Sequence, residues 1–584
     1  GKSRKVLINL IWSIKELCEF NVFYMVLMIF ESILKGILPV ISLLLTQQMV
    51  NNIQLQTRSL QDVVLLLIIL TAVEIFNELC LNYIQLKLNN YEIIFDTFTQ
   101  GKILNKISLL DSKDFEDSST YDLINRTQYD ANAGILGNIK TFFSVLSLSI
   151  STISYIIIII RYSIIISFII ILVPIIRYYF EKKYNLLEYD TIKKNTEYDR
   201  KSYYISYLLT NSEYFKEIKM FSLFNFFIEK YKRLKSICNL GLICLHNKRT
   251  ITYSILSIIE TVIDFFITLR IITQTFIGNL LIGQFLLYNS SINNLKQNMI
   301  SIFSQLSLIY KNSLIVDQIK EFFELPKEVI NEDGIKIKEI KNIRLENVSY
   351  KYSGKDKYTL KNISLTFSCG DFVVLMGCNG SGKSTLMKVI MGIYHDYEGD
   401  IYVDEINLKY INKNIYREKM GVLFQDYIKY ETSISENILY GNLKYNNDLH
   451  KANELLKKVN LQDFLNQGNL ILGYQFTDGR QISIGQWQKL ALARTIIKEA
   501  DLYIFDEPNS SLDLVSENSV LNLIYAETNK IRIIIMHRFN HIILKSNKII
   551  VLKDGCVEEV GTHNDLLKNK GIYYELYCIQ NSLM

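Results

Sequence analysis

The chain has 584 residues, of which 49% are hydrophobic, and a formal net charge of +5. This length is too great for a single hydrophobic core, so at least two domains are expected. A charge of +5 over such a length, without a basic patch interleaved with aromatic residues, argues against nucleic acid as a partner. The eight cysteines form no C-x-x-C pair and the six histidines form no zinc motif, which indicates reduced thiols rather than a disulfide framework.

Residues 1–20 predict an amphipathic helix that lies in the membrane interface. The stretch Val6–Phe20 carries Trp12 among apolar residues and follows a cluster of basic residues. A signal peptide is the alternative interpretation. We reject it because the apolar sequence continues to about Val50 without a small-residue cleavage site.

Six stretches in residues 21–315 are long and apolar enough to span a bilayer, at about 22–49, 61–85, 139–160, 163–180, 251–276 and 283–310. They predict an all-α, six-span transmembrane domain in which Pro39 and Pro174 kink their helices. The connections 86–138 and 181–250 are long, polar and basic, and we expect them to be helices that continue out of the membrane and back. The positive-inside rule then places both connections and both termini in the cytoplasm, which predicts a multi-pass protein of the cytoplasmic membrane.

A charged stretch with Pro326 predicts a linker at residues 316–340. Hydropathy then falls, and short strands alternate with turns and helices over residues 341–584. This second pattern is typical of a soluble α/β domain.

The α/β domain contains a phosphate-binding loop. The buried strand Phe372–Met376 ends in Gly377-x-x-x-x-Gly382-Lys383-Ser384, and a helix follows. The glycines allow backbone N–H groups to turn toward phosphate, Lys383 supplies a positive charge, and Ser384 offers a hydroxyl to Mg²⁺.

A second buried strand, Leu502–Phe505, ends in Asp506 and Glu507. In a phosphate-loop ATPase, Asp506 would hold Mg²⁺ through water and Glu507 would polarise the attacking water. An acidic strand end without a function is the alternative, and Lys383 in the same domain disfavours it.

Further motifs follow in an order that resembles one family. Gln425 in GVLFQD matches the Q-loop of ABC ATPases, and Ile482–Gln486 matches their signature motif, usually LSGGQ. The remaining matches are the D-loop Ser511-Leu512-Asp513, the switch histidine His537 and the adenine-stacking aromatic Tyr352. Over residues 345–570, with the six-span half before them, the chain resembles an ABC exporter half-transporter, a P-loop ATPase domain fused to a membrane domain.

The resemblance implies ATP and Mg as cofactors. It gives catalytic roles to Glu507, His537 and Gln425, and metal contacts to Ser384, Gln425 and Asp506. It also implies that two chains close head to tail, so that the signature of one covers the phosphate held by the other. The nucleotide contacts it implies are Tyr352, Asn379, Gly380, Ser381, Gly382, Lys383, Ser384, Thr385, Gln425, Asp506, Ser483, Gly485, Gln486 and Asp513.

Ile484 departs from the family pattern, because a glycine usually stands there. A branched side chain restricts φ and crowds backbone that approaches a phosphate. In a homodimer both sites would carry this change. In a heterodimer only the site that uses this signature would carry the change. The other site would combine Lys383, Glu507 and His537 with a partner's intact signature.

Two segments resemble the coupling helices of exporters, Asp114–Leu123 and Ser212–Phe221. Within the spans, Glu31 and Lys35 are spaced to pair with each other. Glu260 and Asp264 share one helix face and suggest a site for a cationic group, with pairing to a basic residue such as Arg270 as the alternative.

The stretch Gly485–Lys489, together with Lys216–Lys219, is similar to bacterial exporters of peptides such as bacteriocins and lantibiotics. This similarity favours ATP-driven export of a peptide by alternating access. Membrane lipid is the expected surrounding of the protein. A lipid flippase or a multidrug exporter with a hydrophobic substrate is the alternative. A nucleotide-gated regulator that does not pump is a third hypothesis, which Glu507 disfavours.

Overall fold

The computed structural model describes residues 2–56, 58–328, 331, 333–352, 354, 356–509, 512–536 and 539–581. The chain forms two compact units. Unit 1 contains residues 1–110 and 114–326, and unit 2 contains residues 111–113 and 327–584.

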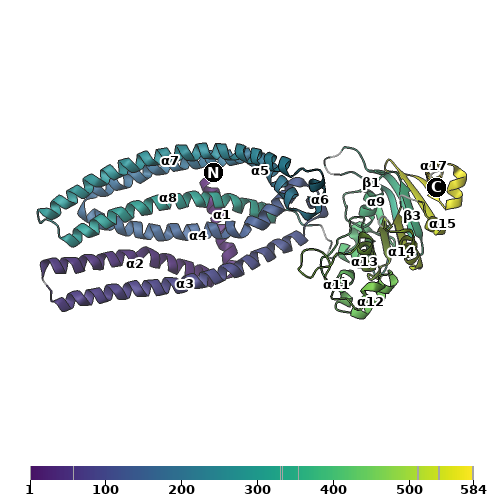
Figure 1. Ribbon diagram of the computed structural model, residues 1–584, viewed down its shortest axis with the longest axis horizontal. Coiled ribbons are helices and arrows are strands. Elements are labelled where there is room, and N and C mark those ends of the chain that lie inside the picture. Colours follow the sequence, from purple (N-terminus) through teal and green to yellow (C-terminus); the bar gives the residue numbers. More distant parts are fainter. Residues whose placement is uncertain are drawn as a thin grey trace. The chain divides into compact units, whose positions relative to one another are not determined.

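Unit 1 is entirely helical in its described residues (Figure 1). Helices α2 and α3 lie side by side, as do α4 with α8 and α5 with α7. Helix α1 buries Leu10 and Leu17, and α8 continues into the stretch 316–340 that we expected to be a linker. The elements are α1 (Lys2–Phe20), α2 (Val22–Leu55), α3 (Leu60–Ser108), η1 (Ser112–Phe115, in part in unit 2), α4 (Ser118–Tyr162), α5 (Ile164–Thr210), α6 (Ser212–Met220), α7 (Phe224–Phe276) and α8 (Ile282–Glu324).

Five described helices are long and apolar enough to cross a membrane, namely α2, α3, α4, α5 and α8. The expected span 251–276 lies within α7, a helix of 53 residues that is not among these five. The membrane-type helical region is therefore confirmed, whereas the count of six spans is not.

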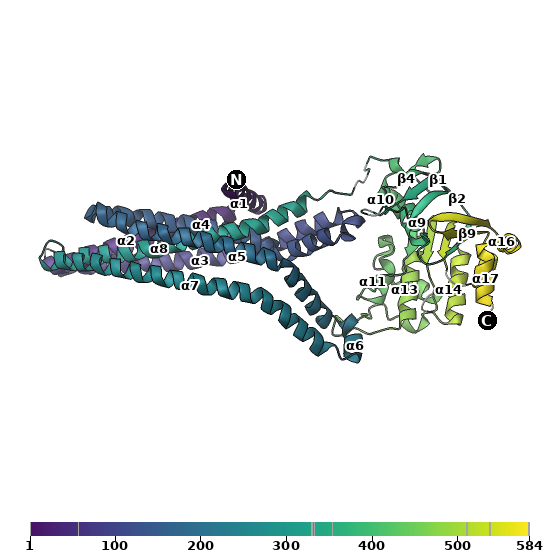
Figure 2. The ribbon, with the colours of Figure 1, turned by 90° about the horizontal axis from the view of Figure 1, so that it is seen from above.

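The long polar connections are helical extensions, as predicted. Helix α3 continues to Ser108 and α5 to Thr210, and the short helix α6 joins α5 to α7 at one end of unit 1 (Figure 2). The expected short helix at Asp114–Leu123 is wrong. A 3-10 turn ends at Phe115, and α4 begins at Ser118, where Asp117 caps it by accepting a hydrogen bond from the Thr120 N–H.

Glu31, Lys35, Glu260 and Asp264 of the unit 1 helices are each paired with an opposite charge. Lys35 Nζ lies 2.6 Å from Glu31 Oε1, as predicted. Glu260 pairs with Arg177 of α5 at 3.3 Å, and Asp264 pairs with Lys296 of α8. The alternative, pairing with basic residues, is therefore confirmed in place of a free site for a cationic group, although neither partner is Arg270. Burial of a charge is costly unless an opposite charge accompanies it, and α5 and α8 supply that charge.

Unit 2 is an α/β domain with two sheets. The antiparallel sheet has the order β2-β1-β4-β5, and Figure 2 shows β1, β2 and β4 gathered at one side of the unit. Its strands are β1 (Asn342–Tyr350), β2 (Leu360–Ser368), β4 (Glu398–Val403) and β5 (Ile406–Asn407). The second sheet has the order β10-β9-β3-β8-β7-β6 and comprises β3 (Phe372–Gly377), β6 (Met420–Leu423), β7 (Leu502–Asp506), β8 (Ile531–Ile535), β9 (Lys548–Lys553) and β10 (Cys556–Gly561).

Strands β3, β6, β7, β8 and β9 run parallel, so their carboxyl ends meet at one edge of the sheet. Strand β3 is buried at every position, and its side chains contribute to the hydrophobic cores on both faces of the sheet. This burial explains the continuous apolar sequence of β3. The helices of unit 2 are α9 (Lys383–Ile390), α10 (Lys413–Glu418), α11 (Ile434–Leu439), α12 (Leu449–Lys458), α13 (Ile484–Ile496), α14 (Leu514–Ala526), α15 (His541–Lys545), α16 (His563–Asn569) and α17 (Ile572–Asn581), with short 3-10 turns η2 (Leu408–Tyr410), η3 (Leu443–Tyr445) and η4 (Gln462–Phe464).

Candidate functional site

The phosphate-binding loop lies between β3 and α9 and depends on glycine at both ends. Gly377 has φ +145°, and a Cβ there would lie 2.2 Å from the carbonyl oxygen of Leu552 on β9. Gly382 has φ +101°, and a Cβ there would lie 3.0 Å from the carbonyl oxygen of Thr359. A side chain at either position would force the neighbouring backbone apart. The loop therefore keeps its path only with glycine at these ends.

Lys383 opens α9 and is buried, with 5% of its surface exposed. Its ammonium group donates hydrogen bonds to the carbonyl oxygens of Gly377 (2.9 Å) and Cys378 (3.0 Å). Burial lowers the pKa of Lys383, although nearby acidic groups oppose this shift. The ammonium is thus held against the loop backbone, where its third N–H could donate to a phosphate oxygen.

Two acidic residues follow β7 at the same edge of the sheet. Burial, reinforced by the Glu507 carboxylate, raises the pKa of Asp506 to about 6. Glu507 has φ +48°, a left-handed backbone that is uncommon for a non-glycine residue and is often found at functional sites. The side-chain amide of Gln425, just after β6, donates to Glu507 Oε2 at 3.2 Å. The fold thus brings together three residues that the sequence had implicated separately.

The signature segment forms the first turn of α13. Ser483 caps the helix: its N–H donates to Gln486 Oε1 at 2.9 Å, and its Oγ accepts from the Gln486 N–H at 3.2 Å. Ile484 takes the first helical position, and its φ is not in the left-handed region. The backbone at Ile484 therefore does not require a glycine, and the expected crowding of a phosphate stays a prediction. The Ile484 side chain does add bulk at the helix N-terminus, where it is 59% exposed.

Two residues that the sequence motifs do not include join the signature helix to the rest of the site. The Gln488 side-chain amide donates to the Glu507 carbonyl oxygen at 3.2 Å, and Gln488 is buried. The Tyr427 hydroxyl donates to the Ile484 carbonyl oxygen at 3.1 Å. Only the position of Gln488, two residues after Gln486, could have suggested such a role.

Among the remaining predicted residues, the structure describes contacts of Tyr352 and Asp513, whereas others lie outside the described residues. The Tyr352 hydroxyl lies 3.0 Å from Thr385 Oγ1, so the segment after β1 reaches the first turn of α9. Asp513 caps α14 by accepting from the Ser516 N–H at 3.4 Å, and hydrogen bonds from the Ser516 side chain and, second, from this N–H lower the pKa of Asp513. The predictions for His537 and Ser511 lie outside the described residues.

The arrangement fits a triphosphate with a divalent cation. The Ser381 hydroxyl is buried inside the loop and has no hydrogen-bond partner among the described residues, as expected for a donor that awaits a phosphate oxygen. Ser384 is exposed in the first turn of α9, whose N-terminus favours anions. The carboxylate of Asp506 is an oxygen ligand of the kind that Mg²⁺ prefers.

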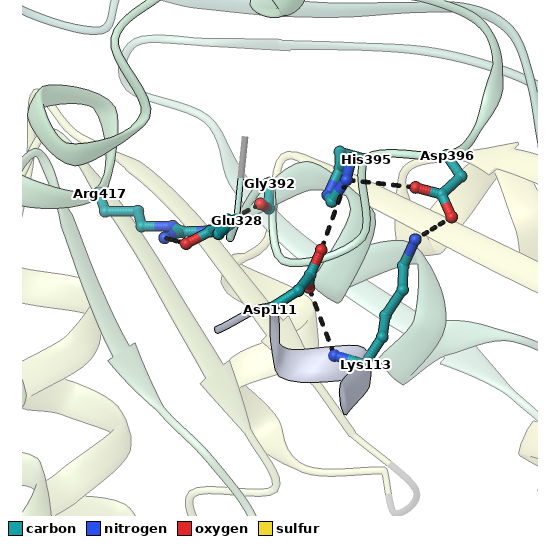
Figure 3. Close-up of polar contacts among 7 residues, drawn as sticks. All are labelled: Asp111, Lys113, Glu328, Gly392, His395, Asp396 and Arg417. Carbon is teal, nitrogen blue, oxygen red and sulfur yellow. Dashed lines mark hydrogen bonds and ion pairs between the residues drawn. The ribbon is translucent and has the colours of Figure 1, made fainter. Parts of the chain in front are cut away.

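A polar cluster of unit 2 includes a segment from far earlier in the chain (Figure 3). His395 Nε2 lies 3.4 Å from Asp111 Oδ2 and 3.4 Å from Asp396 Oδ1, and Lys113 pairs with Asp396. Nearby, Arg417 binds Glu328 with two hydrogen bonds, of 2.6 and 3.2 Å, and also donates to the Gly392 carbonyl oxygen at 2.9 Å. Residues 111–113 of the first long connection are thus anchored in the α/β unit.

Comparison with known proteins agrees with this geometry. The profile of the family described as "ABC transporter" matches residues 360–510. The subtilin transport ATP-binding protein of Bacillus subtilis is 31% identical over 554 residues, which cover 93% of this chain and 90% of that protein. The nisin transport ATP-binding protein of Lactococcus lactis subsp. lactis is 30% identical over 580 residues, which cover 98% and 96%.

A solved structure, that of a bacterial Atm1-family ABC exporter with ATP bound, has the same fold. The two chains superpose with a TM-score of 0.78 over 97% of this chain and 98% of that one. Their sequence identity is 19%, so this likeness concerns the fold alone.

Proposed function

Because the chain belongs to the ABC transporter family, we propose that it uses ATP to export a peptide of the bacteriocin or lantibiotic class across the cytoplasmic membrane. It is a multi-pass membrane protein with an ATPase domain that binds nucleotide. The observation that carries the choice of substrate is the similarity, over nearly the whole chain, to proteins named for subtilin and nisin transport.

In this proposal the residues of unit 2 have the following roles. Lys383 and the N–H groups of residues 379–385 bind the β and γ phosphates, and Tyr352 stacks on the adenine. Glu507 accepts a proton from the attacking water, while Gln425 and Gln488 hold Glu507 in position through its carboxylate and its carbonyl oxygen. Ser384, Gln425 and Asp506 would hold Mg²⁺, which neutralises charge on the transferring phosphoryl group.

We infer that the working unit is a dimer. The N-terminus of α13, capped by Ser483, would present its backbone N–H groups and Gly485 to the γ-phosphate held by a second chain. Asp513 would lie at the same junction. A homodimer places Ile484 at both sites, whereas a heterodimer places it at one.

We further propose that α6 couples the two parts of the transporter. Phe215, Met220 and Phe221 are exposed on or directly after α6. Unit 2 has a mainly apolar cavity of about 380 Å³, lined in part by Phe424, Ile428 and Tyr430. The α6 segment of a second copy would fill it. The test is a disulfide between Phe215→Cys and Tyr430→Cys in a cysteine-free background, with a cross-linked dimer as the expected product and only intrachain or absent cross-linking as the contradicting one.

The proposed transport is tested in inside-out membrane vesicles. We expect ATP-dependent uptake of labelled subtilin or nisin precursor peptide, and loss of that uptake in Glu507→Gln. A fluorescent phospholipid and a hydrophobic dye serve as alternative cargoes in the same vesicles.

Uptake of the lipid or the dye in place of the peptide would overturn the choice of substrate but not the ATPase assignment. ATP turnover without movement of any cargo would instead support a non-pumping regulator. If wild-type vesicles and Glu507→Gln vesicles turn over ATP equally, the assignment of Glu507 itself is wrong.

A further inference from the structure

Unit 1 contains a cavity of about 470 Å³ with charged and apolar side chains in its wall, between α2, α3 and α4. Two ion pairs line it: Lys35 with Glu31, and Lys140 with Glu92 across α4 and α3, each at 2.6 Å. The two lysine side chains are about half exposed, at 48% and 47%. Positive and negative groups therefore border one cavity in equal number and remain accessible from it.

The cavity lies at one end of the apolar spans. Glu31 and Lys35 are in the first half of α2, Glu92 follows the apolar stretch 61–85 of α3, and Lys140 begins the apolar stretch 139–160 of α4. All four charges therefore lie toward the end of the bundle at which α3 and α4 leave the apolar region. Where helices pass from apolar to polar sequence, as α3 and α4 do near Glu92 and Lys140, a bilayer presents its headgroups.

Apolar side chains share the cavity wall with the charged groups, namely Met28, Leu88, Phe143 and Leu148. Elsewhere on α2 and α3, Phe30, Leu86 and Ile93 are 46%, 55% and 70% exposed. A wall with both charged and apolar side chains matches a molecule that has a charged head and hydrocarbon tails.

We propose that this cavity binds the headgroup of a zwitterionic phospholipid with a primary ammonium, such as phosphatidylethanolamine. The phosphate would accept hydrogen bonds from Lys35 and Lys140, and the ammonium would donate to Glu31 and Glu92. A purely anionic headgroup brings no ammonium to the two carboxylates, which would keep only their lysine partners. A choline headgroup has no N–H and cannot donate to them.

The test measures lipid binding to the purified full-length chain by native mass spectrometry. The probes are phosphatidylethanolamine, phosphatidylglycerol and phosphatidylcholine with identical acyl chains. We expect phosphatidylethanolamine to bind about fivefold or more tightly than the other two, the ratio that one additional charge-assisted hydrogen bond provides. Glu92→Gln should remove most of this preference, whereas Glu197→Gln, which breaks an exposed ion pair with Lys201 on α5, should leave it intact.

A charge-swapped variant, Glu92→Lys with Lys140→Glu, keeps an ion pair and so guards against loss of folding. The swap moves one cavity carboxylate from α3 to α4 and should also reduce the preference for phosphatidylethanolamine. Equal affinity of the wild-type chain for all three lipids would overturn the proposal, as would an unchanged preference in Glu92→Gln and in the swapped variant. A photo-reactive group at Asn89 that captures peptide cargo and no phospholipid would assign the cavity to the peptide path instead. None of these measurements depends on transport, so their failure would leave the proposed function standing.

Discussion

The nucleotide site of unit 2 and the charged contacts of unit 1 differ in what holds them in place. In unit 2 the backbone does so: glycines with positive φ, a helix N-terminus and the carboxyl ends of parallel strands position Lys383, Asp506 and Glu507. In unit 1, paired side chains from different helices hold each other in place, as in the pairs Arg177–Glu260 and Lys296–Asp264.

This difference affects how each region responds to substitution. A backbone-held site keeps its geometry when one side chain loses its function, so activity can disappear while binding persists. A pair of charges between helices is held by mutual attraction, and removal of one partner leaves the other buried and uncompensated. The predictions below test this contrast, beginning with the largest effect.

Glu507→Gln should lower ATP hydrolysis by about 10²- to 10⁴-fold, because an amide cannot accept the proton of the attacking water. ATP binding should change little, since the loop that holds the phosphates is built from backbone and Lys383. Steady-state phosphate release and binding of a fluorescent ATP analogue measure the two properties. Equal losses of binding and turnover would show that Glu507 supports the site structurally.

Gly377→Ala should weaken ATP binding by about tenfold or more, because the added Cβ would lie 2.2 Å from the Leu552 carbonyl oxygen at a left-handed φ. Gly101→Ala in α3 is the matched control, since a Cβ there meets nothing within 4 Å. That control should leave binding unchanged and stabilise its helix by about 0.5–1 kcal/mol. Normal nucleotide affinity in Gly377→Ala would contradict the need for glycine at this end of the loop.

The pair Arg177–Glu260 should show the opposite behaviour to the nucleotide site. Its side chains are 15% and 4% exposed, so Arg177→Met or Glu260→Gln alone should cost about 3–5 kcal/mol. The double variant should recover part of this loss. Thermal unfolding of the solubilised protein measures these losses of stability. Lys201→Met and Glu197→Gln form an exposed control pair, for which we expect a loss of about 0–1 kcal/mol. Additive losses would mean that the two charges are not coupled.

Ile484→Gly tests whether bulk at the signature limits the composite site. Removal of an exposed side chain from the first turn of α13 should let the helix N-terminus approach phosphate more closely, and we expect ATP turnover to rise about two- to tenfold. The ATP turnover of Ile484→Ala should lie between that of the wild-type protein and that of Ile484→Gly. A loss of activity in a folded Ile484→Gly would show that the isoleucine contributes to closure.

The amino-acid sequence could identify the candidate nucleotide site because most of its groups belong to short motifs with local geometry. Gly377, Gly382 and Lys383 are defined by one turn, and Asp506 by one strand end. The α/β domain and the long helical extensions could be predicted for the same reason, because hydropathy and periodicity are local signals. Gln488 is the exception, since its role depends on a contact with the Glu507 carbonyl oxygen from another element.

The partners of Glu260 and Asp264 could not be predicted, because they come from α5 and α8 and their pairing is decided by helix packing. Periodicity identified the shared face correctly but not the cations opposite it. The anchoring of residues 111–113 in unit 2 is a similar case, since no local pattern connects Asp111 with His395.

His395 should give the smallest effect, a pH dependence of the stability of unit 2. Burial lowers the pKa of His395, and Lys413 and Lys113 add to this effect, while Asp111 and Glu328 oppose it and Asp396 also faces the ring. The folded unit therefore binds a proton at this site less readily than the unfolded chain. The stabilisation is present above the ordinary histidine pKa of about 6.5 and is lost as the pH falls through that value toward the lower folded pKa.

Trp487 is buried in unit 2 and reports its unfolding by fluorescence once Trp12 is replaced by Phe. Between about pH 7.5 and about pH 5.5, the Trp12→Phe protein should lose more stability in urea than the same protein with His395→Gln. The exposed residue His450 provides the control, and His450→Gln should retain the full pH dependence. If His395→Gln and the parent respond equally to acid, the ring near Asp111 does not govern this stability, and the anchoring of the first connection depends on the ion pair of Lys113 with Asp396 instead.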